Sequence, residues 1–228
     1  MTTQPTRTPQ VAYFVEPNFG ENAYVVSLGA SSPCWIVDPG LPPSAEQILD
    51  HIADLRLTPD AIVLTHAHAD HIAGIPEVLE AFPELPVYLA DEEAEMLENA
   101  ALNLSSAFGA GFVAPVRTRR PLAHGDTLRL GETEWPVIDT SGHSPGGRTL
   151  HCPAASMALV GDAIFAEGIG RYDFPTSDGE TLFRNIRERL MTLPSETMVY
   201  SGHGPRATIG WIAKHNPMVR DVLAGRMD

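Results

Sequence analysis

Four side chains that bind metal ions are concentrated in one short segment, LTHAHADHIAG (64–74). His66 and His68 are two residues apart, so in an extended loop both side chains point to the same side. Asp70 and His71 are adjacent, and where a helix begins their side chains must diverge. We interpret the pattern as two metal sites, with His66 and His68 at the first and Asp70 and His71 at the second. The alternative is a solvated loop in which Asp70 caps the helix.

Four donors do not complete two sites, so further donors are expected at the carboxyl ends of other strands, where ligands gather in α/β folds. His143, Asp162 and His203 each follow an apolar run and lie beside glycine, which lets the backbone approach closely. Each of them taken singly is also typical of an ordinary turn. Together they complete the pattern. We assign His143 to the first site and His203 to the second, and we expect Asp162 to bridge both through its two carboxylate oxygens.

The expected cofactor is a pair of divalent metal ions. Imidazoles and carboxylates suit zinc best, and iron or manganese accepts the same donors. Two such ions lower the pKa of a shared water towards about 7, which favours hydrolysis without a side-chain nucleophile. Asp70 is the candidate catalytic residue, because its carboxylate can also accept a hydrogen bond from the attacking water and orient it.

Strand-like and helix-like segments alternate along the chain and must position these donors. An amphipathic helix over 44–55, with Ser44 as its N-cap, precedes a buried strand over 61–65. Alternation of this kind indicates an α/β or α+β fold. No linker or repeat divides the chain, so we expect a single domain over 1–228. Other helices are expected over 75–82, 91–101 and 180–193, and other strands over 11–17, 22–28, 34–38, 86–90, 126–130, 133–139, 148–152, 157–162 and 197–202.

The composition of the chain disfavours some classes of binding partner. The net charge of −14 disfavours nucleic acid, because phosphate binding relies on lysine and arginine. No stretch is apolar for the roughly 18 residues that a membrane span needs, and the N-terminus does not resemble a signal peptide, so a cytoplasmic location is expected. Cys34 and Cys152 lie far apart in apolar contexts and are expected to be free thiols.

The succession THAHADH, GHSPGG, GDAIF and SGHGP resembles the metallo-β-lactamase-fold hydrolases, over about Asn22 to Pro217. The resemblance implies an αββα sandwich of two mixed sheets flanked by helices, with a binuclear site along one edge. It also implies that the Asp38 carboxylate of WIVDPG orients metal ligands, although an ordinary Asp-Pro-Gly turn fits that segment as well. Carried over position by position, it gives the ligand sets already reached from spacing: His66, His68 and His143; Asp70, His71 and His203; and Asp162 shared.

Within that superfamily, GIGRYDFP (168–175), ALNLSS (101–106) and HNPM (215–218) resemble the short glyoxalase II-like group. The implied activity is hydrolysis of a small-molecule thioester such as S-D-lactoylglutathione. Arg171 is the candidate for holding a substrate carboxylate, and an internal pair with Asp173 is the alternative. Full-length glyoxalase II has a helical domain that contacts glutathione, whereas 25 residues follow His203 here. Thioester cleavage is therefore better supported than glutathione as the leaving group.

Two other functions stay open. Persulfide dioxygenases share the fold and hold a single iron, which here would be bound by His66, His143 and Asp162. The complete second set ending at His203 counts against that reading. A non-catalytic member that binds metal or a partner is disfavoured by the intact ligand set. The acyl group, the thiol and the oligomeric state are open at this point.

Overall fold

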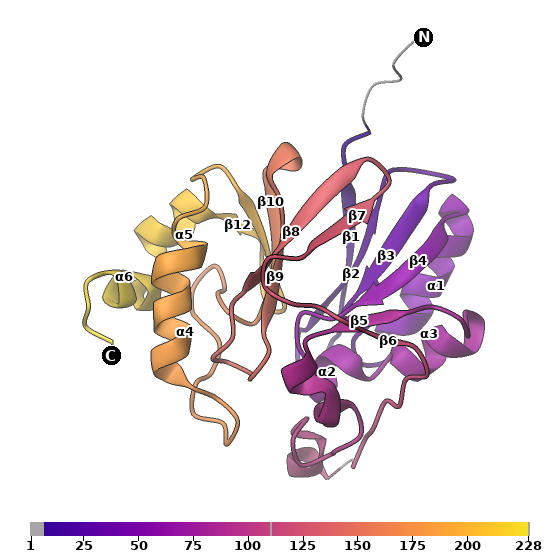
Figure 1. Ribbon diagram of the computed structural model, residues 1–228, viewed down its shortest axis with the longest axis horizontal. Helices are drawn as coiled ribbons and strands as arrows, with labels where there is room; N and C mark the ends of the chain where they lie inside the picture. Colours follow the sequence, from indigo (N-terminus) through magenta and orange to yellow (C-terminus); the bar gives the residue numbers. More distant parts are fainter. Residues whose placement is uncertain (1–6, 110, 228) are drawn as a thin grey trace.

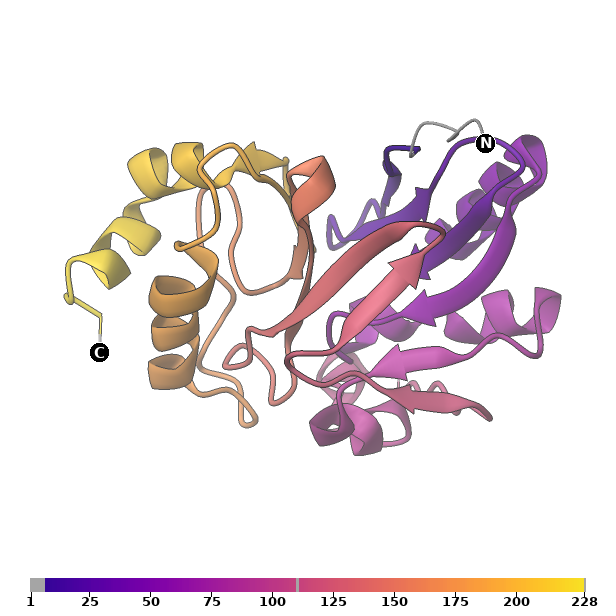
Figure 2. The ribbon, with the colours of Figure 1, turned by 45° about the horizontal axis from the view of Figure 1, so that its top comes forward.

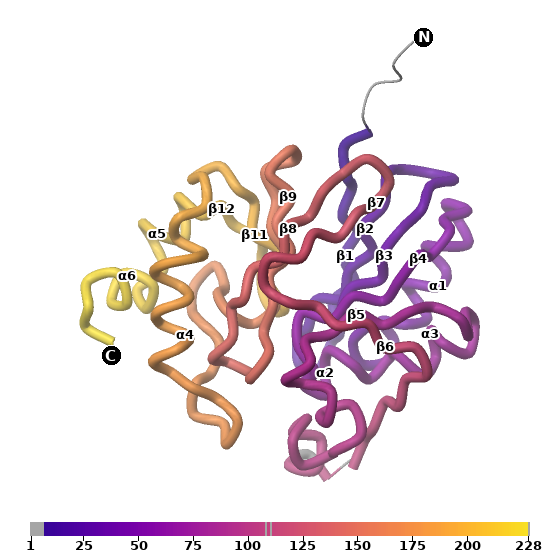
Figure 3. The backbone as a smooth tube through the Cα atoms, in the orientation of Figure 1, coloured from indigo at the N-terminus to yellow at the C-terminus, as the bar shows by residue number. Residues whose placement is uncertain are grey.

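The elements are arranged in four layers, and the computed structural model describes residues 7–109 and 111–227. Two six-stranded sheets pack face to face, and helices cover the outer face of each (Figures 1 and 2). The first half of the chain, indigo to magenta, forms one sheet with its helices, and the second half, pink to yellow, forms the other (Figure 3). Both sheets are mixed, and with helices on both outer faces this is the αββα sandwich that the family resemblance implies.

The first sheet has the strand order β1-β2-β3-β4-β5-β6. β2 is antiparallel to its neighbours β1 and β3, and β3 to β6 run parallel. The bounds are β1 (Gln10–Val15), β2 (Asn22–Ser27), β3 (Pro33–Val37), β4 (Thr58–Val63), β5 (Val87–Leu89) and β6 (Arg119–Pro121).

The second sheet has the order β12-β11-β10-β9-β8-β7, with β10 and β11 parallel and the other neighbours antiparallel. The bounds are β7 (Thr127–Leu130), β8 (Thr133–Asp139), β9 (Arg148–Cys152), β10 (Met157–Gly161), β11 (Met198–Ser201) and β12 (Ala207–Thr208).

Alternation along β3 shows how the layers are held together. Successive side chains of a strand point to opposite faces of the sheet. Cys34 and Ile36 belong to the apolar cluster between the first sheet and its helices, whereas Trp35 and Val37 belong to the cluster between the two sheets. In that central cluster the rings of Trp35 and Trp135 meet edge to face, with centroids 5.6 Å apart. A third cluster joins the second sheet to its own helices.

The helices fall into two groups, one for each sheet (Figure 2). Against the first sheet lie α1 (Ser44–Leu55), the single turn α2 (Ala69–Ile72) and α3 (Ile75–Ala81). Against the second lie α4 (Gly179–Asn185), α5 (Ile209–His215) and α6 (Pro217–Leu223). Short 3₁₀ segments are η1 (Asp91–Leu97), η2 (Ser105–Phe108) and η3 (Pro153–Ala155), and η4 (Ile186–Leu190) is a π-helix.

The sequence prediction was wrong about the cap of α1. Pro43 occupies the N-cap position, and no side chain caps the helix there. The backbone N–H of Gln47 donates to the carbonyl of Pro43, so Ser44 lies inside the first turn rather than before it. The side chain of Ser44 is buried instead.

Two predicted α-helices take other forms. The acidic segment predicted over 91–101 is a 3₁₀ helix over Asp91–Leu97, in which Glu93 accepts tertiary hydrogen bonds rather than facing solvent. The helix predicted over 180–193 is α4 continued by η4. Near that junction Asn185 and Arg189 donate to the carbonyls of Ser141 and Asp139.

Four parallel strand ends face the same edge of the sandwich. β3 ends just before Asp38, and β4 leads into the loop that carries His66 and His68. In the other sheet, β10 ends just before Asp162 and β11 just before the turn that carries His203. The fold thus delivers chemically active side chains from both sheets to one place, as the strand-end argument predicts.

Two further expectations concern the whole chain. Cys34 and Cys152 are buried free thiols. Within residues 7–109 and 111–227, no helix combines the length and the hydrophobicity that crossing a membrane requires.

Candidate metal centre

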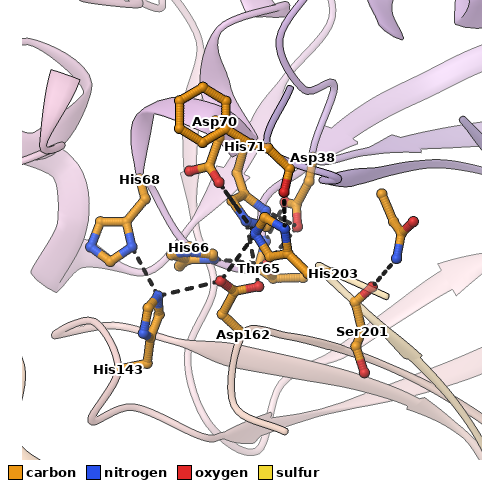
Figure 4. Close-up of polar contacts among 12 residues, drawn as sticks. Asp38, Thr65, His66, His68, Asp70, His71, His143, Asp162, Ser201 and His203 are labelled. Atoms are coloured by element: carbon orange, nitrogen blue, oxygen red, sulfur yellow. Dashed lines mark hydrogen bonds and ion pairs between the residues drawn. The ribbon is translucent and has the colours of Figure 1, made fainter. Parts of the chain in front are cut away.

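The first donor set gathers two loops that come from opposite sheets (Figure 4). His68 has an extended backbone before α2, and its Nδ1 lies 3.0 Å from Nε2 of His143. Nδ1 of His143 donates to the carbonyl of Arg171 at 2.7 Å, which leaves Nε2 of that ring unprotonated and facing the cluster. His66, His68 and His143 each offer a nitrogen within 4.8 Å of the other two.

The second set joins the single turn α2 to the loop after β11. Asp70, His71 and His203 also offer atoms within 4.8 Å of one another. Nε2 of His203 lies 3.2 Å from Oδ2 of Asp70, and Nε2 of His71 lies 3.9 Å from the same oxygen. Asp70 and His71 thus share a site with His203, and His66 and His68 share one with His143. His66 also lies beside His71, with ring centroids 4.0 Å apart, and the two group with Asp38 as well.

Asp162 lies between the two sets. Its Oδ2 is 3.6 Å from Nε2 of His143 and 3.4 Å from Nε2 of His203, and its Oδ1 is 3.5 Å from Nε2 of His71. The backbone makes room for it at Gly202, where a β-carbon would collide with this carboxylate. Asp162 is therefore placed to serve both sets.

Unpartnered polar atoms show that this cluster fits metal ions. Nε2 of His66, Nε2 of His71 and Oδ1 of Asp162 are buried, and within the described part of the chain they have no hydrogen-bond partner. A buried polar group without a partner is strongly destabilising, so several converging on one point form a site suited to a bound cation. Imidazole nitrogens with carboxylate oxygens form a donor set suited to zinc, iron or manganese.

The protonation of the first set favours metal binding. Burial lowers the pKa of His68 to about 3 and holds the pKa values of His66 and His143 below their ordinary value. These three imidazoles are therefore neutral at pH 7, which is the state that donates to a metal ion.

The second set differs in protonation. Burial acts to lower the pKa of His203, but its hydrogen bonds with Asp162 and Asp70 outweigh burial and raise it to about 10. The carboxylates of Asp70 and Asp162 likewise outweigh burial at His71 and raise its pKa well above the ordinary value. Without a metal ion, His71 and His203 therefore hold protons that a metal must displace.

Asp38 lies directly behind His71. Its Oδ2 is 3.0 Å from Nδ1 of His71 and accepts from Oγ1 of Thr65 at 2.6 Å, while its Oδ1 accepts from the Thr65 backbone N–H at 2.8 Å. The buried carboxylate thereby fixes the ring orientation of His71. This placement supports the predicted role of Asp38 in orienting ligands.

Arg171 lies at the cavity above the donors, and its side chain is paired with Asp173. Nε and Nη2 of Arg171 donate to the two carboxylate oxygens of Asp173, both at 2.9 Å. The guanidinium carbon lies 4.2 Å from the centre of the Phe174 ring. Both members of the ion pair are 64% exposed. The internal pair that the sequence offered as an alternative is therefore formed in the structure.

Sequence reasoning missed Glu93, a fully buried carboxylate behind the first set. It accepts hydrogen bonds from the backbone N–H of Ala67, from Oγ of Ser144 and, at 2.8 Å, from the backbone N–H of Gly146. One carboxylate thus ties the loop of His66 and His68 to the loop of His143. Burial raises the pKa of Glu93 to about 7, while these hydrogen bonds act in the opposite direction.

Sequence reasoning also missed the cavity in front of the donors, whose volume is about 560 Å³. Five donor side chains line it: His68, Asp70, His143, Asp162 and His203. A small molecule that enters this cavity therefore meets both donor sets. That volume lies within the usual range for small-molecule sites, roughly 300 to 1,000 Å³.

Comparison with known proteins identifies the family. The family model of the metallo-beta-lactamase superfamily matches residues 17–203, which include all seven donors. The probable metallo-hydrolase YqgX of Bacillus subtilis is 38% identical over 203 residues, covering 87% of this chain and 92% of that protein. Hydroxyacylglutathione hydrolase GloC of Haemophilus influenzae is 30% identical over 185 residues, covering 81% of this chain and 86% of that protein.

Solved structures agree with this relationship. The BLEG-1 B3 metallo-beta-lactamase superposes with a TM-score of 0.86 at 34% identity, covering 92% of this chain and 99% of that one. TTHA1623 in a di-iron-bound form superposes with a TM-score of 0.80 at 36% identity, covering 91% of this chain and all of that one. Fold, donor geometry and sequence agree, and this chain belongs to the metallo-β-lactamase superfamily, whose members include metal-dependent hydrolases.

Proposed function

We propose that this chain is a thioester hydrolase of the glyoxalase II type that acts with two divalent metal ions. The observation that carries the proposal is the pair of complete donor sets that meet at Asp162. Similarity to GloC, named a hydroxyacylglutathione hydrolase, supports S-D-lactoylglutathione or a related hydroxyacyl thioester as the substrate.

The metal ions would be held by the residues that the two sets contain. His66, His68 and His143 would hold one, Asp70, His71 and His203 the other, and Asp162 would contact both. Bound there, divalent ions supply Lewis acidity, which activates water at neutral pH and polarises a carbonyl.

Asp70 is placed to orient the attacking water. Its carboxylate lines the cavity and is 22% exposed, so one oxygen can accept a hydrogen bond from water while Oδ2 stays near His203. Burial acts to raise the pKa of Asp70, but His71 and the hydrogen bond with His203 outweigh burial and lower it. Asp70 is therefore ionised at neutral pH and accepts rather than donates.

Cleavage of the thioester then needs little acid assistance. Water adds to the carbonyl carbon, the carbon–sulfur bond breaks, and the products are a carboxylic acid and a thiol. Because thiols have pKa values near 8.5, the sulfur can leave as thiolate. This matches a site whose described side chains offer carboxylates and neutral histidines at the donor cluster but no lysine there.

A persulfide dioxygenase with one iron is the second candidate. It would use His66, His143 and Asp162, and Oδ2 of Asp162 does lie 3.6 Å from Nε2 of His143. Such an enzyme leaves the second set without a catalytic task. His203 therefore discriminates between the two candidates.

The experiment combines metal analysis with two activity assays. We would measure zinc, iron and manganese in the purified protein, release of thiol from thioesters, and oxygen consumption with glutathione persulfide. A β-lactam belongs in the panel because BLEG-1 is named a B3 metallo-beta-lactamase. His203→Ala should abolish most thioester hydrolysis, whereas His215→Ala, on an exposed residue of α5, should change it little. Oxygen consumption that survives His203→Ala, with one iron per chain, would favour the dioxygenase instead.

A further inference from the structure

The walls of the cavity are apolar although its floor is built from metal-binding side chains. Above the donors stand four phenylalanines, Phe19, Phe112, Phe165 and Phe174, together with Leu104 and Ile169. These residues come from segments far apart in the chain and line the same cavity as the donors. A substrate must therefore place its reacting carbonyl at a charged centre while the rest of it contacts hydrocarbon.

The polar side chains of the wall are already hydrogen-bonded within the protein. Nδ2 of Asn103 donates to the carbonyls of Met96 and Phe112, both at 3.0 Å, and its Oδ1 accepts from the backbone N–H of Ser105. Oγ of Ser105 donates to the Phe112 carbonyl and accepts from the Phe112 N–H. Asn103 and Ser105 thus build the wall and leave few groups for a ligand.

Outside the donor cluster, positive charge is equally restricted. Among the described residues that line the cavity, Arg171 is the one lysine or arginine, and two of its donor groups face Asp173. A glutathione moiety carries two carboxylates, which normally require such cations. The surrounding chain has a net charge of −14, which repels anions further.

Leu104 contributes to the apolar wall although its backbone conformation disfavours leucine. Its φ of 70° and ψ of −1° place it in the left-handed region, which disfavours leucine by roughly 1 kcal/mol and is tolerated better by asparagine. The residue before it, Asn103, is anchored by its side chain and by its carbonyl, which accepts from the N–H of Ala69 at 2.9 Å. The loop therefore presents a leucine to the cavity where asparagine would fit the backbone better.

From these observations we infer that this cavity prefers an uncharged thioester with an apolar acyl chain over a glutathione thioester. The inference rests on the proposed thioesterase activity and specifies its substrate class. Apolar contact with the phenylalanine wall supplies the binding energy, and Arg171 stays with Asp173.

Two matched substrate series test this inference. In the first, acetyl, butyryl and hexanoyl thioesters of N-acetylcysteamine differ only in acyl length. We expect kcat/KM to rise about threefold for each added methylene group that enters the wall. In the second, the D-lactoyl group is carried by glutathione or by N-acetylcysteamine, and we expect the neutral thioester to be cleaved at least as efficiently.

One variant distinguishes an effect on the apolar wall from an effect on the stability of the protein. Leu104→Asn relieves the left-handed backbone, so the melting temperature should not fall, while kcat/KM for the hexanoyl thioester should drop about tenfold, more than that for the acetyl thioester. Leu223→Asn makes the same substitution at an exposed position on α6 and should alter neither substrate.

The outcomes distinguish a wrong substrate class from a wrong catalytic function. A preference for the glutathione thioester of more than tenfold, or no dependence on acyl length, overturns the substrate inference while thioesterase activity stands. If the metal-loaded protein cleaves no thioester, the proposed function fails, and the substrate inference fails with it.

Discussion

The carboxylate of Glu93 accepts a hydrogen bond from the backbone N–H of Ala67, the residue between His66 and His68. Three residues on from His143, in a different sheet layer, the backbone N–H of Gly146 donates to the same carboxylate. Glu93 contacts donors only through the backbone and hydroxyl groups of their neighbours. Its role is to hold two ligand loops at a fixed separation.

Glu93→Gln should therefore weaken the first metal site more than the second. The amide has one acceptor oxygen, and its NH₂ group would face an N–H or a hydroxyl that needs an acceptor, which leaves a buried donor unsatisfied. We expect zinc affinity at the first site to fall about tenfold to a hundredfold in competition with a chromogenic chelator. Glu92→Gln, on the neighbouring carboxylate that pairs with Arg148, is the matched control and should leave both affinities unchanged.

Asp162→Ala should remove more metal than any single histidine variant. Asp162 is the residue whose carboxylate lies beside His143 of one set and both His71 and His203 of the other. Its loss also removes the negative charge between two cations. Elemental analysis of the purified variant should find well under one metal ion per chain, and activity should vanish. Two bound ions with near-normal turnover would show that the carboxylate bridges nothing.

Metal binding should release protons at the second site but not at the first. At pH 7 His66, His68 and His143 are already neutral, because burial depresses their pKa values. His203, with its pKa raised to about 10, and His71, whose pKa is also raised, must each lose a proton. Affinity for the second ion should consequently rise with pH, by about tenfold per unit for each proton released.

Isothermal titration calorimetry in buffers of different ionisation enthalpy measures those protons. Zinc that binds the first site of the metal-free protein should release few protons, and zinc that binds the second site should release more. Equal release for both ions would contradict the difference between the sets. His203→Ala should lower the release for the second ion.

Asp173→Asn should change the response to substrate charge. The substitution weakens the fork that holds Arg171, and because both side chains are 64% exposed it should alter stability little. The released guanidinium can then bind an anionic ligand, so KM for S-D-lactoylglutathione should fall severalfold while a neutral thioester is unaffected. Adding Arg171→Met should abolish the gain. If both substrates respond equally, Arg171 does not contact the thiol half at all.

The donor residues were predictable because metal ligands need particular side chains at particular spacings. His66, His68, Asp70 and His71 stand together in six residues, and local geometry predicts that His66 and His68 point one way and Asp70 and His71 diverge. It does not predict that His66 also groups with His71 and Asp38. The alternation of strands and helices was predictable because buried strands and amphipathic helices have distinct periodicities, whereas the αββα layering followed from the family resemblance.

Glu93 could not be predicted, because nothing local separates it from its neighbours. Asp91, Glu92 and Glu93 form an acidic run, yet Asp91 pairs with Arg119 at the surface and Glu93 alone is fully buried. That difference arises from tertiary packing against loops more than 25 residues away.

The last two helices, α5 and α6, could have been predicted from the sequence. Thr208 and Asn216 accept from backbone N–H groups three residues on, as N-caps do.

The position of the donors at the seam between the sheets has a consequence for the whole molecule. His68 and His143 are 75 residues apart in the chain and belong to loops of different sheets. An ion shared by them would act as a cross-link, restricting the unfolded chain much as a disulfide does, an effect of roughly 4 kcal/mol for a loop of that length. Removing the ions with a chelator would then weaken the attachment of the two sheet layers to each other. The same ions would stabilise the fold as well as form its reactive centre.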